Sequence, residues 1–175
     1  MPEMTMLGWF HTVLGVVAVS SGFYTLYKYR VISVQEGPGK LYVYVTLLVA
    51  ASALGIYNQG GFGIAHILAV LTLLALAGGL IMEKIKLFRS LSKYFQALCY
   101  TSTLLFHMIP AITDFLRRLP VGDPFIDSFE DPLLVKFYLA FLLIFVVGII
   151  AQIFGSKNKK IKINLFRSLI LLQTL

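Results

Sequence analysis

Residues 61–82 read GFGIAHILAVLTLLALAGGLIM and contain no Asp, Glu, Lys or Arg. A helix needs about 20 predominantly apolar residues to cross the hydrocarbon core of a bilayer. This stretch therefore predicts a transmembrane helix, and the segments on either side of it decide how often the chain crosses the membrane.

Four more apolar stretches have a suitable length. We expect spans at residues 7–28, 41–57, 61–82, 94–115 and 133–154. The second is the shortest, and a polar, glycine-rich turn at residues 58–61 separates it from the third. The prediction is an all-α integral membrane protein with five transmembrane helices, in one domain over residues 1–155.

The composition agrees with this class. Of 175 residues, 58% are hydrophobic and 13% charged, and the mean hydropathy is +0.85. Soluble domains carry about 25% charged residues. The net charge is +7, but the basic residues gather at the ends of the spans. We therefore expect anionic lipid head groups, and not nucleic acid, as the partner of this charge.

The charge alternates between successive loops and predicts the orientation. Basic residues concentrate in the first loop, the third loop and the tail: Lys28, Arg30 and Lys40, then Lys84, Lys86, Arg89 and Lys93, then Lys157, Lys159, Lys160, Lys162 and Arg167. Because cytoplasmic loops carry the excess of Lys and Arg, these regions are expected inside. The N-terminus is then outside and the C-terminus inside. The first six residues contain no Lys or Arg, so we expect the first span to be retained and not cleaved as a signal peptide.

Small residues indicate which helices pack together. Membrane helices approach closely where small side chains lie four apart, as Ala18 with Gly22 and Ala75 with Gly79. Residues 133–154 are mostly large and aliphatic, which predicts a four-helix core with a peripheral fifth helix. That helix is also the expected contact for a membrane-protein partner. The basic tail at 156–175 is either an interfacial helix on the cytoplasmic leaflet or a disordered segment.

Aromatic residues cluster at the predicted membrane boundaries. We interpret Tyr24, Tyr27, Tyr29, Tyr42, Tyr44 and Tyr94 as anchors at the inner interface. No cofactor role is expected for them.

His11, His66 and His107 are the candidate cofactor-binding residues. They fall on three different spans, each nearer the predicted outer face, at depths of about 6–8 Å for the first two and about 12 Å for the third. Ionisable side chains at membrane depth are costly, and three in one half of the bilayer indicate a functional site. Facing histidines suit a haem b iron or a transition metal, and a single histidine suits proton transfer or a bond to a quinone. Three isolated structural histidines are the alternative.

Two neighbours of His107 bear on this site. Pro110 removes a helical hydrogen bond and favours a kink that would steer His107 inward. Asp114 follows His107 on the same face, but Arg117 and Arg118 lie three and four residues beyond it. An ion pair with one of these arginines is favoured over a bond from Asp114 to a histidine.

Residues 11–118 resemble a bacterial family of small multi-spanning proteins. Members of that family have a histidine early in the first helix and a His-Arg-x-x-Gly-Arg-x-Tyr entry to the second. Here Gly39-Lys40-Leu41-Tyr42 matches the second half of that entry, whereas Gln35 and Glu36 stand where the His-Arg half belongs. The resemblance implies a multi-helix inner-membrane protein and no particular activity. A weaker likeness to membrane cytochromes b rests on architecture and histidine placement alone.

Three functions follow from these observations. The first is a haem- or metal-binding redox subunit in a bacterial inner (plasma) membrane. The second is a small transporter whose cavity would be lined by the hydroxyl residues of the spans: Ser20, Ser21, Thr46, Ser52, Thr72, Thr101, Ser102 and Thr103. The third is a non-catalytic assembly partner in a larger complex. The sequence contains no P-loop, nucleophile elbow or dinucleotide fingerprint, and it assigns no enzyme activity.

Overall fold

The computed structural model describes residues 5–57 and 61–173, with side chains up to residue 155. Within these ranges the chain is all-helical: α1 (Met6–Tyr29), α2 (Gly37–Ala53), α3 (Ile64–Lys84), the 3-10 turn η1 (Arg89–Leu91), α4 (Ser92–Arg118) and α5 (Pro132–Gln173). Four of the helices, α1, α3, α4 and α5, are long and apolar enough to cross a membrane. The helical membrane class predicted from the sequence is confirmed at this level.

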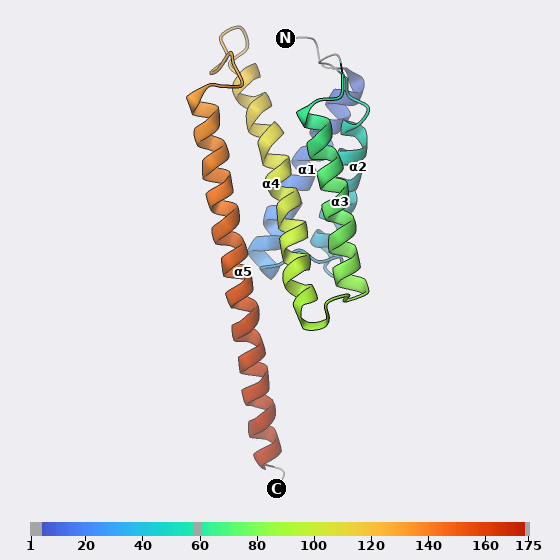
Figure 1. Cartoon of the computed structure of the whole chain (residues 1–175), viewed down its shortest axis with the longest axis vertical. Helices are drawn as coiled ribbons and strands as arrows, with labels where there is room; N and C mark the ends of the chain where they lie inside the picture. The colour runs from blue at the N-terminus through green and yellow to red at the C-terminus, as the bar shows by residue number, and fades with distance from the viewer. Residues whose placement is uncertain (1–4, 58–60, 174–175) are drawn as a thin grey trace.

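The helices lie side by side along one direction (Figure 1). The α1–α2 and α3–α4 connections lie at one end of the bundle, and the α4–α5 loop lies at the other end with the start of α1 (Figure 1). A hydrogen bond from the Val34 amide to Glu83 joins the α1–α2 connection to the end of α3, next to the α3–α4 connection. The described basic residues of both connections therefore share one end of the molecule.

Two helices differ most from the expected spans in their boundaries. The second was predicted at 41–57, but α2 runs from Gly37 to Ala53. It begins early because Pro38 occupies the first turn, where its missing N–H costs nothing and its fixed φ suits a helix. The predicted turn at 58–61 lies mostly outside the described residues. The fifth span was predicted to end at 154, but α5 continues without a break to Gln173. The placement of the tail on a membrane surface stays a prediction.

Two glycines make room for two buried tyrosines in the core. A Cβ atom on Gly22 of α1 would lie 2.8 Å from the Tyr42 ring of α2, and one on Gly79 of α3 would overlap the Tyr100 ring of α4. Both tyrosines are completely buried. The small-residue pairs at Ala18/Gly22 and Ala75/Gly79 thus lie where helices approach closely, as small-residue spacing predicts.

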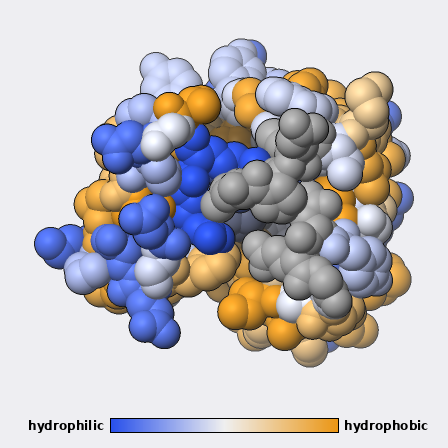
Figure 2. All heavy atoms as spheres, turned by 90° about the horizontal axis from the view of Figure 1, so that it is seen from above, coloured by the Kyte–Doolittle hydropathy of each residue, from blue (hydrophilic) through white to orange (hydrophobic). Residues whose placement is uncertain are grey.

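Polar pairs join α5 to α4 near both ends of their contact. Thr101 bonds the amide group of Gln152 at 3.2 Å, and the hydroxyls of Thr113 and Tyr138 lie 2.6 Å apart. In the most apolar 18-residue stretch of α5, 6% of the residues are buried, whereas the corresponding shares in α1, α3 and α4 are 22–33%. Seen from the end that holds the α4–α5 loop, hydrophilic side chains gather on one side, and hydrophobic ones cover much of the rest of the outline (Figure 2).

Candidate functional site

A buried hydrogen bond between two hydroxyls lies at the centre of the bundle. The Tyr42 hydroxyl of α2 is 2.6 Å from Oγ1 of Thr103 on α4, and both side chains are fully buried. Thr103 donates its own proton to the carbonyl oxygen of Tyr100, so Tyr42 is the donor in the bond to Thr103. The direction of this hydrogen bond determines which neighbouring groups act as donors.

His107 joins the same network one helical turn further along. Its Nε2 atom lies 3.2 Å from Oγ1 of Thr46, which is fully buried and is itself a partner of the Tyr42 hydroxyl. Because the Tyr42 proton is committed to Thr103, Thr46 donates to Tyr42 and His107 donates to Thr46. Each donor in this series is matched to an acceptor, as buried polar groups require.

His11 of α1 lies close enough to His107 to interact with it electrostatically. The Nδ1 atom of His11 is 3.0 Å from Oγ of Ser52 on α2. Ser52 donates its proton to the carbonyl of Val49, so the His11 ring carries its proton on Nδ1. The Nε2 atom of His11 is then the basic nitrogen of the ring.

Glu83, near the end of α3, receives several donors at the opposite end of the bundle. Its carboxylate accepts the Ser33 hydroxyl at 2.5 Å, the Val34 amide at 3.1 Å and the Tyr100 hydroxyl at 3.1 Å. Several donors converging on one carboxylate satisfy its capacity to accept hydrogen bonds. Glu83 thereby ties the α1–α2 connection to α3 and α4.

These groups form one series through the interior of α1–α4, which we call the polar chain: Glu83, Tyr100, Thr103, Tyr42, Thr46, His107 and His11. It begins beside the two basic connections and ends near the start of α1. No hydrogen bond links the Tyr100 hydroxyl to Thr103, because Thr103 bonds the backbone carbonyl of Tyr100. Hydrogen bonds join Glu83 to Tyr100, Tyr42 to Thr103 and Thr46 to His107. Thr46 also interacts with the Tyr42 hydroxyl, and the two histidines interact electrostatically.

His66 has different surroundings from the other two histidines. At the start of α3 its Nδ1 accepts the Gly63 amide at 3.1 Å, and its ring stacks between Tyr57 and Phe62, with centroid distances of 4.7 and 4.9 Å. Its Nε2 is buried and has no hydrogen-bond partner among the residues that the structure describes. The structure thus places His11 and His107 within electrostatic range of each other and His66 beside two aromatic rings. A cofactor shared by all three stays a prediction.

The acidic neighbour of His107 makes the ion pair that its spacing predicts. Asp114 lies 3.8 Å from Arg118, and Arg117 stacks on the Phe129 ring at 3.9 Å. The helix continues through Pro110 to Arg118. Among the described residues, no group of three or more His, Cys, Asp or Glu side chains could hold a metal ion.

Sequence reasoning missed three members of the polar chain: Tyr42, Tyr100 and Glu83. Tyr42 was interpreted as an interfacial anchor, which is wrong because the gap at Gly22 admits its ring to the core. Neither Glu83 nor Tyr100 was singled out from the sequence. The available signal was a single carboxylate beside four basic residues, Lys84, Lys86, Arg89 and Lys93, at the expected membrane boundary.

Comparisons with known proteins add no identification: no family model matches the chain, and neither a curated protein nor a solved structure does so at a significant level.

Proposed function

We propose that this chain is a five-span membrane protein that conducts protons through its four-helix core along the polar chain. The observation that carries the proposal is the series of titratable and hydroxyl groups from Glu83 to His11. Apolar side chains surround this series, and Tyr42, Thr46, Tyr100 and Thr103 within it are buried. Such groups inside a membrane protein are costly and mark ion or proton pathways.

The chemistry of the two ends suits this role. The ring nitrogens of a histidine can both accept and donate a proton, so His11 and His107 can load or release a proton on the side of the α1 N-terminus. Glu83 can do the same at the other end, where Tyr100 donates to it. The hydroxyls between them both donate and accept, which proton transfer along hydrogen bonds requires.

One step needs more than the side chains. Transfer between the Tyr100 and Tyr42 hydroxyls calls for a bridging water or a rotation of one ring, because no direct hydrogen bond links them. If this transfer limits the rate of proton conduction, conduction is slow. Slow conduction is compatible with a carrier or a regulated pathway.

The topology belongs to the same proposal. We infer that α2, with 17 residues, is a fifth, short span beside the four longer helices, with the N-terminus outside, in a bacterial inner membrane. The haem or metal redox subunit and the assembly partner stay untested hypotheses. Both histidines of the polar chain already bond a hydroxyl, and this arrangement favours proton chemistry.

Proton flux into vesicles tests the proposal. Purified protein is reconstituted into liposomes that contain a pH-sensitive dye, and a potassium diffusion potential drives protons inward. We expect faster acidification than in empty liposomes, and Tyr42→Phe should remove most of the difference because it deletes the central hydroxyl.

Tyr138→Phe is the matched control. It also deletes a tyrosine hydroxyl 2.6 Å from a threonine that donates to its own helix, but it lies between α4 and α5 and outside the polar chain. Each change is expected to cost about 1 kcal/mol of stability. Wild-type liposomes no more permeable than empty ones, or equal loss in both variants, would refute proton conduction.

A further inference from the structure

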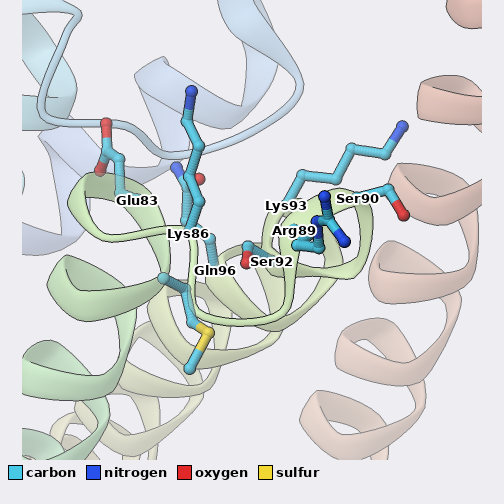
Figure 3. A pocket seen from close by; sticks show the side chains of 8 residues that line it. Glu83, Lys86, Arg89, Ser90, Ser92, Lys93 and Gln96 are labelled. Carbon is cyan, nitrogen blue, oxygen red and sulfur yellow. The ribbon is translucent and has the colours of Figure 1, made fainter.

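A hollow lies where α3 ends and α4 begins, at the end of the bundle that holds Glu83 (Figure 3). Its volume is about 300 Å³. Three basic side chains line it together with three neutral polar ones: Lys86, Arg89, Lys93, Ser90, Ser92 and Gln96. We call this the α3–α4 hollow.

The charge of the hollow is positive. Glu83 is its one acidic lining residue, and both carboxylate oxygens already accept hydrogen bonds, from Ser33, Val34 and Tyr100. The ion pair found among the described residues joins Arg118 and Asp114 at the other end of the bundle. No described carboxylate therefore forms an ion pair with Lys86 or Arg89.

The backbone holds two of the basic residues in an unusual conformation. Lys86 has φ 54° and Arg89 has φ 51°, in the left-handed region that glycine and asparagine occupy more easily. The turn is held by a 2.7 Å bond between the Arg89 amide and the Lys86 carbonyl, and the Ser92 hydroxyl accepts the Phe88 amide. Backbone strain at basic residues that line a hollow is typical of binding sites.

Apolar side chains stand beside these cations. Ile85, Leu87 and Phe88 are exposed on the same connection. A segment with exposed apolar side chains next to lysine and arginine matches the boundary between lipid tails and head groups.

We propose that the α3–α4 hollow binds a phosphate group, and that the group belongs to the head of an anionic phospholipid. The arginine fork and the lysine ammonium groups match phosphate oxygens, and the Ser90 hydroxyl adds a neutral donor. Basic pockets between membrane helices on the cytoplasmic side bind such head groups. Free phosphate shares this chemistry, but it would gain nothing from the apolar flank. None of the basic residues belongs to the polar chain, so this site can be tested separately from proton conduction.

Lipid retention measured by native mass spectrometry tests the site. Delipidated full-length protein is incubated with phosphatidylglycerol or with phosphatidylcholine, and with phosphatidylglycerol in the presence of inorganic phosphate. We expect preferential retention of phosphatidylglycerol. The double variant Lys86→Gln/Arg89→Gln should bind it about thirtyfold more weakly, at the usual contribution of a basic residue near a membrane surface.

The control is the double variant Lys40→Gln/Lys84→Gln. It removes the same charge from the same end of the bundle but leaves the lining of the hollow intact, so its retention of phosphatidylglycerol should stay within a few-fold of the wild type. If the first double variant loses helical circular dichroism, Arg89→Gln alone replaces it.

Displacement of the lipid by inorganic phosphate would support a phosphate site in the α3–α4 hollow. It would overturn the assignment of the phosphate group to a phospholipid and indicate a soluble ligand. Equal retention of the two lipids, or equal weakening in the two double variants, would overturn the phosphate site.

Discussion

At the scale of single residues, Gly22 decides whether the polar chain can exist. A Cβ atom there would lie 2.8 Å from the Tyr42 ring and 3.2 Å from a methyl carbon of Leu104. The ring is fully buried and has no room to move away. Overpacking of this kind costs about 1–3 kcal/mol, more than the ~1 kcal/mol that alanine adds to helix propensity.

We therefore expect Gly22→Ala to destabilise the protein and to weaken the bond between Tyr42 and Thr103. Gly15→Ala on the same helix is the matched control, because a Cβ at Gly15 meets nothing within 4 Å. Thermal unfolding in detergent should show a lower melting temperature for Gly22→Ala and an unchanged or slightly higher one for Gly15→Ala. Equal melting temperatures for both variants would show that the close contact between Gly22 and Tyr42 does not determine stability.

Residue types in the sequence predict part of the candidate site, and tertiary contacts decide the rest. The three histidines are evident from the sequence because ionisable groups are rare at membrane depth. Which of them meet depends on helix rotation, which hydropathy does not encode. Tyr42 could equally be an anchor or a core residue, and only Gly22, twenty positions earlier on a neighbouring helix, makes it the latter.

At the scale of elements, α4 carries most of the polar contacts. It supplies Tyr100, Thr103 and His107 to the polar chain on one side, and Thr101 and Thr113 to α5 on the other. Hydrogen bonds between membrane helices contribute about 0.6 kcal/mol on average. The attachment of α5 to α4 should therefore be weakened by the loss of a single threonine hydroxyl.

Thr101→Val tests this attachment, and Thr72→Val is its control. Both residues are buried threonines, but Thr72 bonds only the Leu68 carbonyl of its own helix in the structure, whereas Thr101 bonds Gln152 of α5. Unfolding by detergent titration should show a loss of roughly 0.6 kcal/mol for Thr101→Val and a much smaller change for Thr72→Val. The reverse order would mean that α5 is held by apolar contacts alone.

Helix boundaries follow from local sequence where a strong signal is present. The start of α2 could have been placed at Gly37 from Pro38, which favours the first turn of a helix. The early start also depends on Gly39, where a Cβ would overlap the Ser33 carbonyl of the α1–α2 connection. Hydropathy alone favours a later start, because residues 37–40 are not apolar enough to resemble a span.

At the scale of the whole molecule, the basic and acidic connections lie at opposite ends of the bundle. The α1–α2 and α3–α4 connections, which carry most of the described basic loop residues, share one end of the bundle, and the acidic α4–α5 loop lies at the other (Figure 1). If the bundle crosses a membrane, the basic end is cytoplasmic by the positive-inside rule. Glu83 and the α3–α4 hollow then face the cytoplasm, and His11 lies toward the outside.

Cysteine labelling in intact cells tests this orientation. Cys99→Ala removes the native thiol, and Ser128→Cys or Ser90→Cys then adds one at the acidic or the basic end of the bundle. We expect a membrane-impermeant maleimide to label Ser128→Cys in intact cells and Ser90→Cys only after permeabilisation, while the Cys99→Ala parent stays unlabelled. The opposite pattern would invert the topology and place the Glu83 end of the polar chain outside. Labelling of both sites in intact cells would show that the acidic and basic ends of the bundle do not lie on opposite sides of a membrane.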